Sequence, residues 1–512
     1  MRASSDRHGY TRRAAWFGCC MALSFASAAL GSTQTGPNIV LILADDLGWN
    51  DVGYHGSEIS TPNIDALATQ GVVLNQFHSQ PTCTPTRAAL MTGKSPQRMG
   101  IYRQFAKIST EGLPVSEKTL ADHLRAAGYQ TWLTGKWHLG HSRAEFHPNA
   151  RGFDHFYGHV TGGIGYWDHV HGGGLDWQRN GRTLREEGYS THLIAEEAVR
   201  LVRTRQPSRP FFLYASFNAP HLPNEAPEKA MQAYAGIENP QRRVHAAMVT
   251  ELDAAVGEIV RTLEDEKLLD DTLIWFMSDN GGLNRDAGLG GFLTLAEALD
   301  DWFEAPVPIR FLEFIRTNAL DGGSDNGPLR FGKGSVYEGG VRVPSFVTFP
   351  PALDPHRSDA MVTVQDVLPT LLAAAALEPA DGLDGRNRWP ELRQEPGESP
   401  PADYVTIGQN GAQAYYRWPW KLIATNGQHE LYNLETDPLE EQNLADVETE
   451  VVSTLALELS QLPRAESLHV PVYRVVWDPD FFGGEEDRQP WADIIDRAMH
   501  EQRAVKTGGY LP

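Results

Sequence analysis

The chain has 512 residues, of which 41% are apolar and 21% carry a charge, a balance typical of soluble proteins that bury a large core. Its formal net charge of −22 argues against a nucleic-acid partner and against a basic anchor for a membrane surface. An anionic ligand must therefore be attracted by a local group of cations or by a metal ion, because the overall field repels anions.

The first 30 residues have the pattern of a signal peptide. Arg12 and Arg13 precede an apolar run that ends at Leu30, with small residues suited to cleavage at positions 26–28. The run is short and broken by polar residues, which disfavours a transmembrane anchor, and no later stretch is apolar enough to span a bilayer. We expect an exported protein, periplasmic or extracellular, with no membrane span in the mature chain.

The first predicted strand is a continuous apolar run at residues 38–44 that ends in Asp45 and Asp46. A buried parallel strand delivers such residues to the carboxyl edge of an α/β sheet, where these proteins place their sites. Adjacent carboxylates repel each other unless a cation neutralises them. A bare acidic pair on a loop is usually a solvated turn, but after a buried strand metal ligation and a solvated turn are equally good interpretations.

A second strand, predicted at residues 128–134, runs into Lys136 and His138. These two residues lie two positions apart, so on an extended segment both side chains can face one side. A lone histidine near a strand end is more often structural than catalytic. The other motifs make His138 a candidate catalytic residue.

Two more strands are predicted to end in polar residues. Residues 211–217 lead to His221, which is flanked by prolines that restrict its backbone. Residues 273–277 lead to Asp279 and Asn280, after a long amphipathic helix that we interpret as scaffold. Parallel strands would bring these side chains to the same edge as the first acidic pair.

Cysteine occurs only at positions 19, 20 and 83, and the first two lie in the predicted leader. The mature chain therefore keeps one cysteine, which is a buried small side chain, a reactive thiol or the substrate of a modification. The segment Cys83-Thr84-Pro85-Thr86-Arg87 resembles the signature of the sulfatases, in which the cysteine is oxidised to formylglycine before folding. That family most often has serine where Thr86 stands.

Further segments resemble the type I, formylglycine-dependent sulfatases in the family's order, over about residues 37–445. They lie at residues 48–53, 83–93, 128–140, 278–282, 328–333 and 337–344. The amino-acid sequence of these segments is most similar to the arylsulfatase B, or N-acetylgalactosamine-4-sulfatase, type. Several separated motifs are much stronger evidence than one short signature.

The resemblance implies an α/β fold with an alkaline-phosphatase-like central mixed sheet flanked by helices, and a smaller C-terminal α+β domain. We expect the catalytic domain at residues 37–400, with a linker at 390–402, and the small domain and tail at 401–512. Residues 283–327 look like an insertion, for which two packed amphipathic helices, a lid, a dimer contact and a local subdomain are open interpretations.

The resemblance also implies that one divalent cation is bound by Asp45, Asp46, Asp279 and Asn280 together with formylglycine at position 83. Three carboxylates and an amide form an oxygen set that suits a hard cation, Ca²⁺ first and Mg²⁺ second. The metal would compensate the acidic cluster and polarise the sulfate.

Roles for five further residues follow from the same resemblance. Arg87 and Lys136 would hold the nucleophile, His138 would exchange its proton, and His221 and Lys333 would bind the sulfate or protonate the leaving oxygen. One hydroxyl of the hydrated formylglycine would attack sulfur, and the other would lose its proton as sulfate is expelled. Serine would lack that second hydroxyl.

The function implied is a sulfuric ester hydrolase acting on a sulfated carbohydrate or aryl sulfate, in the degradation of glycosaminoglycans or sulfated polysaccharides. A formylglycine-generating maturation enzyme is the expected partner. One alternative is a formylglycine-dependent phosphonate monoester or phosphodiester hydrolase, which shares the superfamily fold. Another is a metal- or glycan-binding protein without catalysis, which an unmodified Cys83 would produce.

Overall fold

The structure is a computed structural model that describes residues 36–107, 109–171, 174–284, 322–395 and 403–468. The predicted signal peptide, most of the predicted insertion and the predicted domain boundary near residue 400 lie outside these ranges. Within the described ranges, no helix combines the length and apolar character needed to cross a bilayer.

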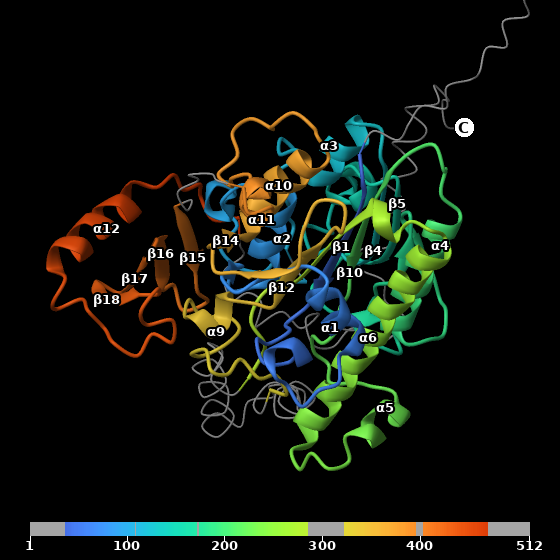
Figure 1. Cartoon of the computed structure of the whole chain (residues 1–512), viewed down its shortest axis with the longest axis horizontal. Coiled ribbons are helices and arrows are strands. Elements are labelled where there is room, and N and C mark those ends of the chain that lie inside the picture. Colours follow the sequence, from blue (N-terminus) through green and yellow to red (C-terminus); the bar gives the residue numbers. More distant parts are fainter. Residues whose placement is uncertain (1–35, 108, 172–173, 285–321, 396–402, 469–512) are drawn as a thin grey trace, which may run out of the picture. The chain divides into compact units, whose positions relative to one another are not determined.

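A ten-stranded mixed sheet forms the centre of the fold (Figure 1). Its strands lie in the order β13 (His356–Ser358), β2 (Val72–Leu74), β12 (Ser345–Thr348), β11 (Thr272–Ser278), β1 (Asn38–Ala44), β10 (Phe211–Ser216), β4 (Gln130–Lys136), β5 (His155–His159), β8 (Gln178–Arg179) and β9 (Arg182–Thr183). The five strands from β11 to β5 run parallel, whereas β12, β8 and β9 each pair antiparallel with their neighbours. The predicted mixed sheet is confirmed.

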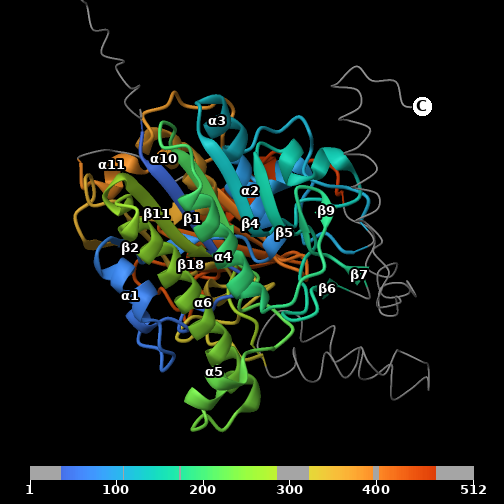
Figure 2. The ribbon, with the colours of Figure 1, turned by 90° about the vertical axis from the view of Figure 1, so that its right-hand side faces the viewer.

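Helices cover both faces of this sheet (Figure 2). One face carries α2 (Cys83–Thr92), α3 (Leu120–Ala126) and α10 (Val367–Ala374), and the other carries α1 (Pro62–Thr69), α4 (Ser190–Arg203) and α6 (Pro240–Asp265). The smaller elements are β3 (Phe77–His78) paired with β14 (Val362–Thr363), β6 (Val170–His171) paired with β7 (Gly174–Leu175), α5 (Glu228–Ala233), α9 (Glu338–Val341) and α11 (Trp389–Leu392).

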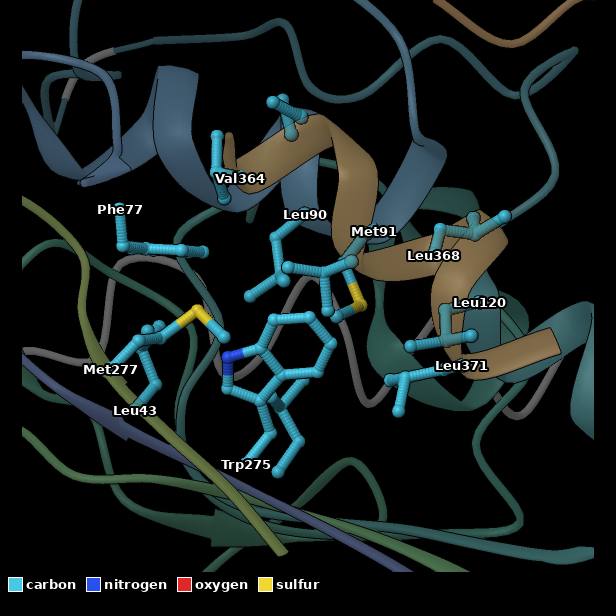
Figure 3. Packing of buried hydrophobic residues seen from close by; sticks show 14 of the residues in the cluster. Leu43, Phe77, Leu90, Met91, Leu120, Trp275, Met277, Val364, Leu368 and Leu371 are labelled. Atoms are coloured by element: carbon cyan, nitrogen blue, oxygen red, sulfur yellow. The ribbon is translucent and has the colours of Figure 1, made fainter. Parts of the chain in front are cut away.

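The alternation of side chains along β1 explains why both faces are covered. Leu41 and Leu43 belong to the core under α2, α3 and α10, whereas Val40 and Ile42 belong to the core under α1, α4 and α6. All are fully buried, so the continuous apolar run of β1 reflects a strand covered on both sides. Figure 3 shows Trp275 of β11 packed beneath α2 and α10 on the first of these faces.

The strand after α3 begins two residues later than predicted and ends later as well. Gly128 has φ +94°, a left-handed conformation that favours glycine, so it belongs to the turn before β4. At its other end β4 extends through Lys136, which places that side chain at the end of a strand rather than on the loop beyond it.

The C-terminal part forms a separate four-stranded antiparallel sheet with one helix, as the predicted fold class requires. The sheet consists of β15 (Tyr404–Ile407), β16 (Gln413–Arg417), β17 (Trp420–Thr425) and β18 (Gln428–Asn433), and the helix is α12 (Thr449–Gln461). Leu455 and Leu459 of α12 pack in one cluster with Leu422 and Leu431 of the sheet. The linker predicted at 390–402 is wrong at its start, because α11 occupies Trp389–Leu392 with proline in its first turn.

A buried ion cluster joins this small sheet to α9. The Lys421 Nζ atom of β17 lies 2.9 Å from Glu338 Oε1 and 2.6 Å from Glu440 Oε1, and Glu338 Oε2 lies 2.9 Å from His78 Nε2. Burial raises the pKa of Glu338, but the charges of Lys421 and His78 outweigh burial and lower that pKa overall. Glu338 is therefore ionised and depends on Lys421 for compensation.

We expect Lys421→Met to lower the free energy of unfolding by about 3–5 kcal/mol, because it leaves the buried Glu338 carboxylate without its ammonium partner. Arg417→Ala, on the neighbouring strand, removes a surface pair with Glu458 and should cost less than about 1 kcal/mol. Urea unfolding followed by circular dichroism measures both. Equal losses in the two variants would contradict this assignment.

Candidate active site

The acidic residues predicted at two strand ends meet because β1 and β11 run parallel in register. Ala44 pairs with Ser278, so Asp45 and Asp279 leave the sheet side by side. The Asp279 amide donates to the Ala44 carbonyl at 3.0 Å, and the Asp46 amide donates to Asp279 Oδ1 at 3.2 Å. Two sequence segments more than two hundred residues apart thereby form one acidic corner.

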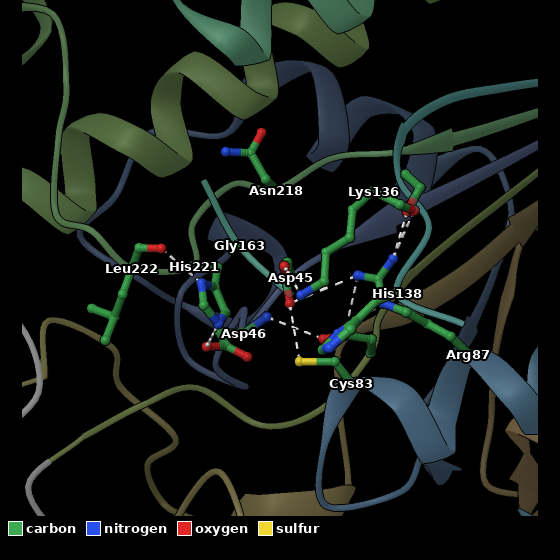
Figure 4. A network of polar contacts seen from close by, with 12 residues as sticks. Asp45, Asp46, Cys83, Arg87, Lys136, His138, Gly163, Asn218, His221 and Leu222 are labelled. Atoms are coloured by element: carbon green, nitrogen blue, oxygen red, sulfur yellow. Dashed lines mark hydrogen bonds and ion pairs between the residues drawn. The ribbon is translucent and has the colours of Figure 1, made fainter. Parts of the chain in front are cut away.

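Three cations lie against these three carboxylates. The ion pairs are Lys136 Nζ to Asp45 Oδ2 at 2.6 Å, Lys333 Nζ to Asp46 Oδ2 at 2.6 Å, and Arg87 Nη2 to Asp279 Oδ2 at 2.8 Å. All six side chains are buried, and Figure 4 shows four of them converging. Burial raises the pKa of Asp46, but the charges of Lys333, His221 and Lys136 outweigh burial and lower that pKa overall.

The oxygen atoms of this corner fit a hard divalent cation. Asn280 Nδ2 donates to Asp46 Oδ1 at 2.8 Å, while Asn280 Oδ1 is buried without a hydrogen-bond partner among the described residues. Burial and the charge of Asp45 raise the pKa of Asp279 to about 6, even though Arg87 opposes the shift. A cation would satisfy the amide oxygen and stabilise the ionised acids.

One group of four residues has ligand atoms within 4.8 Å of one another, namely Asp45, Asp46, Cys83 and His221. Cys83 is the first residue of α2 and is 2% exposed, with its Sγ atom 3.5 Å from Asp45 Oδ1. Burial and the charges of Asp279 and Asp45 raise the pKa of the thiol despite the nearby lysines. An unmodified Cys83 is therefore protonated near neutral pH and is a poor nucleophile.

His138 departs from the geometry expected for it. Its φ is +57°, in the left-handed region, so the extended chain stops at Lys136 and the prediction that both side chains share one side of a strand is wrong. His138 Nε2 donates to the Phe105 carbonyl at 3.0 Å, and its Nδ1 has no hydrogen-bond partner within the described ranges. Burial and the charge of Lys136 lower the pKa of His138, which favours the neutral ring.

His221 lies next to Asp46. Its Nδ1 donates to the Leu222 carbonyl at 2.7 Å, and its Nε2 lies 3.7 Å from Asp46 Oδ2. Burial and the charge of Lys333 lower the pKa of His221 to about 3, although Asp46 opposes the shift. Every residue named from sequence as a catalytic or metal-binding candidate thus lies in or directly beside this one cluster.

Ser216, at the end of β10, was not identified from sequence. Its Oγ accepts from Arg87 Nη1 at 2.7 Å and donates to the Lys136 carbonyl at 2.8 Å. Ser216 pairs with Gly135, where a Cβ atom would lie 1.9 Å from the Ser216 carbonyl oxygen. A glycine next to Lys136, at the end of a buried strand, was the one available signal of this close approach.

Asp51 was also missed, although it fixes the loop that carries the acidic pair. Its carboxylate accepts from the Gly48 amide at 3.0 Å, from Ser324 Oγ at 2.5 Å and from His245 Nε2 at 2.9 Å. An ion pair with Arg242 of α6 adds to these contacts. No regular spacing in the sequence links these segments, so the contact emerges only from the fold.

We expect Ser216→Ala to reduce kcat/KM about tenfold or more, because Arg87 loses a buried hydrogen bond that orients it toward Asp279. The substitution removes one oxygen atom and leaves the packing of β10 intact. Steady-state kinetics measures the effect, with thermal melting to verify folding. Unchanged kinetics in a folded variant would show that Ser216 does not position Arg87.

Comparison with known proteins gives consistent matches over most of the chain. The profile of the family described as Sulfatase matches residues 37–377. Mouse arylsulfatase J is 33% identical over 428 residues, which cover 77% of this chain and 65% of that protein. Human N-acetylgalactosamine-6-sulfatase is 32% identical over 429 residues, which cover 79% of this chain and 72% of that protein.

Solved structures agree with these sequence matches. The crystal structure of Ps i-CgsB has a TM-score of 0.74 and 32% identity, and covers 87% of this chain and 97% of that one. The same protein in complex with k-i-k-neocarrahexaose has a TM-score of 0.73 and 31% identity, with the same coverage. The matched part of this chain spans slightly under two thirds of arylsulfatase J.

Proposed function

Because this chain belongs to the sulfatase family, we propose that it hydrolyses sulfuric esters with residue 83, oxidised from cysteine to formylglycine, as its nucleophile. One observation carries the proposal: Cys83 begins α2 within the cluster of buried carboxylates and cations. In this environment a thiol stays protonated, whereas a hydrated aldehyde offers two hydroxyl groups to the same neighbours.

The cations of the cluster are the groups that would compensate the charge of a sulfate ester. Lys136 and Lys333 are buried ammonium groups that pair with two different carboxylates of the acidic corner. Arg87 is held by both Asp279 and Ser216. Such preorganised donors stabilise charge that develops on a transferring group without reorganising at the moment of reaction. They also provide local attraction for an anion in a chain with a net charge of −22.

The two histidines are suited to different proton transfers. His138 donates through Nε2 to a backbone carbonyl, so its Nδ1 is the atom that can accept a proton from the nucleophile. His221 is fixed in the converse way, because Nδ1 donates to Leu222 and leaves Nε2 facing Asp46. We assign His221 with Lys333 to the sulfate and the leaving oxygen.

We propose Ca²⁺ as the bound cation, held by Asp45, Asp46, Asp279 and Asn280 together with residue 83. The orphaned Asn280 oxygen, the grouped carboxylates of Asp45 and Asp46 and the adjoining Asp279 support an oxygen-ligated hard cation, with Mg²⁺ as the second choice. When bound, it would polarise the sulfate and the nucleophile and lower the cost of holding three acids together.

We propose a sulfated carbohydrate as the substrate, in an exported protein. Human N-acetylgalactosamine-6-sulfatase and Ps i-CgsB with k-i-k-neocarrahexaose are relatives at 32% and 31% identity whose names refer to sugars. The leader pattern of residues 1–30 supports export, and oxidation of Cys83 requires a formylglycine-generating maturation enzyme.

The central test is peptide mass spectrometry of the fragment containing residue 83, combined with an aryl sulfate assay. We expect the mass change from thiol to aldehyde, turnover of the aryl sulfate and no turnover by Cys83→Ala, because alanine offers no nucleophile. A phosphate diester assayed in parallel tests the alternative hydrolase. An unmodified thiol in protein from the native host, or substantial activity in Cys83→Ala, would overturn the mechanism.

We expect chelation to abolish activity and Ca²⁺ to restore it, because the acidic corner needs a divalent cation to orient the reacting groups. Asn280→Ala should raise the Ca²⁺ concentration needed for half-maximal recovery, since it removes the unpaired buried oxygen. Titration of metal-free protein measures this. Full activity after complete metal removal would contradict the ligand assignment.

A further inference from the structure

Two large aromatic side chains are exposed in the described part of the chain. Trp167 is 50% exposed and Phe331 is 37% exposed, whereas the other large exposed apolar side chains there are aliphatic. The proposed mechanism uses neither ring. Each ring belongs to a loop that packs on or contains one of the two residues assigned to the sulfate, which are His221 and Lys333.

The loop that carries Trp167 is anchored to His221. The Tyr166 hydroxyl donates to the carbonyls of Asn218 and His221, both at 2.9 Å, and the Tyr166 ring is fully buried. A Cβ atom on Gly163 would lie 3.0 Å from the His221 ring, and Figure 4 shows this glycine beside it. Trp167 follows Tyr166 directly, so the backbone that carries the exposed ring is fixed within one residue of a contact with His221.

The Trp167 ring is also fixed by its own packing. Its centroid lies 5.0 Å from that of Tyr189, which precedes α4 and stacks on Tyr166 at 5.0 Å. The Tyr166 amide donates to Glu225 at 2.7 Å, and the exposed Asp168 accepts from a backbone amide two residues later at 3.0 Å. A ring held in this way loses little conformational entropy when a ligand covers its exposed half.

Phe331 lies two residues before Lys333, whose Nζ atom contacts Asp46 Oδ2 at 2.6 Å. Its φ is +62°, a left-handed conformation that is an outlier for a bulky side chain. The ring packs on Tyr337 with 4.7 Å between centroids, and the Arg330 guanidinium lies 5.2 Å from the Phe331 ring and 4.4 Å from the Tyr337 ring. Glycine would avoid the strain at this position, so a half-exposed phenylalanine here indicates a function for the ring.

The two aromatic loops meet the site at one carboxylate oxygen. Lys333 Nζ lies 2.6 Å from Asp46 Oδ2, and His221 Nε2 lies 3.7 Å from the same atom. Both exposed rings are therefore linked through a few residues to the point where the sulfate of the substrate is proposed to bind.

Polar side chains with exposed surface accompany each ring. They are Asp168 and Glu225 on the first loop and beside it, and Arg330 and Glu430 next to the second ring. Sites for small ligands combine aromatic surfaces with a few polar groups that fix orientation. A sugar matches this combination, because its C–H bonds pack on the electron-rich face of an aromatic ring while its hydroxyl groups bond to the polar neighbours.

We propose that Trp167 and Phe331 are stacking surfaces for sugar rings of the substrate next to the sulfate that is removed. This inference rests on the proposed sulfatase function and adds to it a preference for chain length. A sulfated monosaccharide fills the sulfate site without covering both rings. The enzyme would thus favour sulfated oligosaccharides over the corresponding monosaccharides.

Kinetics tests the stacking surfaces with an aryl sulfate, sulfated galactose and N-acetylgalactosamine, and the carrageenan and chondroitin sulfate hexasaccharides that contain these units. We expect the native enzyme to have a higher kcat/KM on a hexasaccharide than on its monosaccharide. Trp167→Ala and Phe331→Ala should each reduce this preference about tenfold, mainly through KM, because each removes one ring contact. Trp167→Phe should retain most of it.

Phe331→Gly separates the ring from the backbone that carries it. Glycine adopts a φ of +62° without strain and alanine does not, so Phe331→Gly should melt at a higher temperature than Phe331→Ala. Both variants should lose the preference for hexasaccharides to the same extent. A preference restored in Phe331→Gly would trace the loss in Phe331→Ala to backbone strain and would overturn the role of the ring.

Leu457→Ala serves as the matched control, because Leu457 is an apolar side chain of α12 that is 60% exposed. It should leave the preference unchanged. Equal kcat/KM on monosaccharides and hexasaccharides in the native enzyme, or an equal loss on every substrate in both alanine variants, would overturn the stacking surfaces and leave the sulfatase function intact. Size-exclusion chromatography adds a further check: a native dimer that dissociates in either alanine variant with its preference unchanged would assign the rings to a contact between copies and overturn the proposal.

Calorimetry with Cys83→Ala repeats the comparison for binding alone. Tighter binding of a hexasaccharide than of its monosaccharide, weakened by adding Trp167→Ala or Phe331→Ala, would support the stacking surfaces even if no sulfate ester were hydrolysed. Equal affinities would overturn them. Absence of aryl sulfate turnover by matured enzyme would instead refute the proposed function, so the two failures are distinguishable.

Discussion

The site depends on a balance of buried charge at the carboxyl edge of the sheet. Asp45, Asp46 and Asp279 are brought together by parallel strands, and each would be expensive to bury without compensation. Lys136 and Lys333 come from other segments to supply it, with Arg87 from α2. The fold therefore concentrates carboxylates and cationic side chains at one point. A metal cation and an anionic ester can both bind there with little change in the net charge of the site.

This balance explains how a strongly acidic chain can serve an anionic substrate. The overall charge of −22 acts at long range and is screened by salt within about 8 Å at physiological ionic strength, whereas the lysines act at contact distance in a water-poor site. The same carboxylates that hold the lysines raise the pKa of the Cys83 thiol. A cysteine is thus poorly suited to act here as a thiolate, and the position favours an oxygen nucleophile.

Much of the fold could be predicted from local sequence pattern, whereas most of the candidate residues were predicted from the resemblance to the sulfatases. The apolar run of β1 is followed directly by two acidic residues, so the end of the strand alone places these acids at the carboxyl edge of the sheet. Ser216, Asp51 and the left-handed backbone of His138 could not be predicted in this way. Each depends on which distant segment approaches it, and their side chains follow no periodicity.

The small C-terminal sheet helps to hold the candidate active site in place. Lys421 of β17 compensates Glu338, the first residue of α9. The same turn of α9 backs the Asp279–Asn280 segment, because the Gly281 amide donates to the Gly340 carbonyl at 3.0 Å and a Cβ atom on Gly281 would lie 1.8 Å from the Gly339 carbonyl oxygen. A displacement of α9 would therefore move the amide oxygen of Asn280, so the buried ion cluster and the acidic corner are mechanically connected.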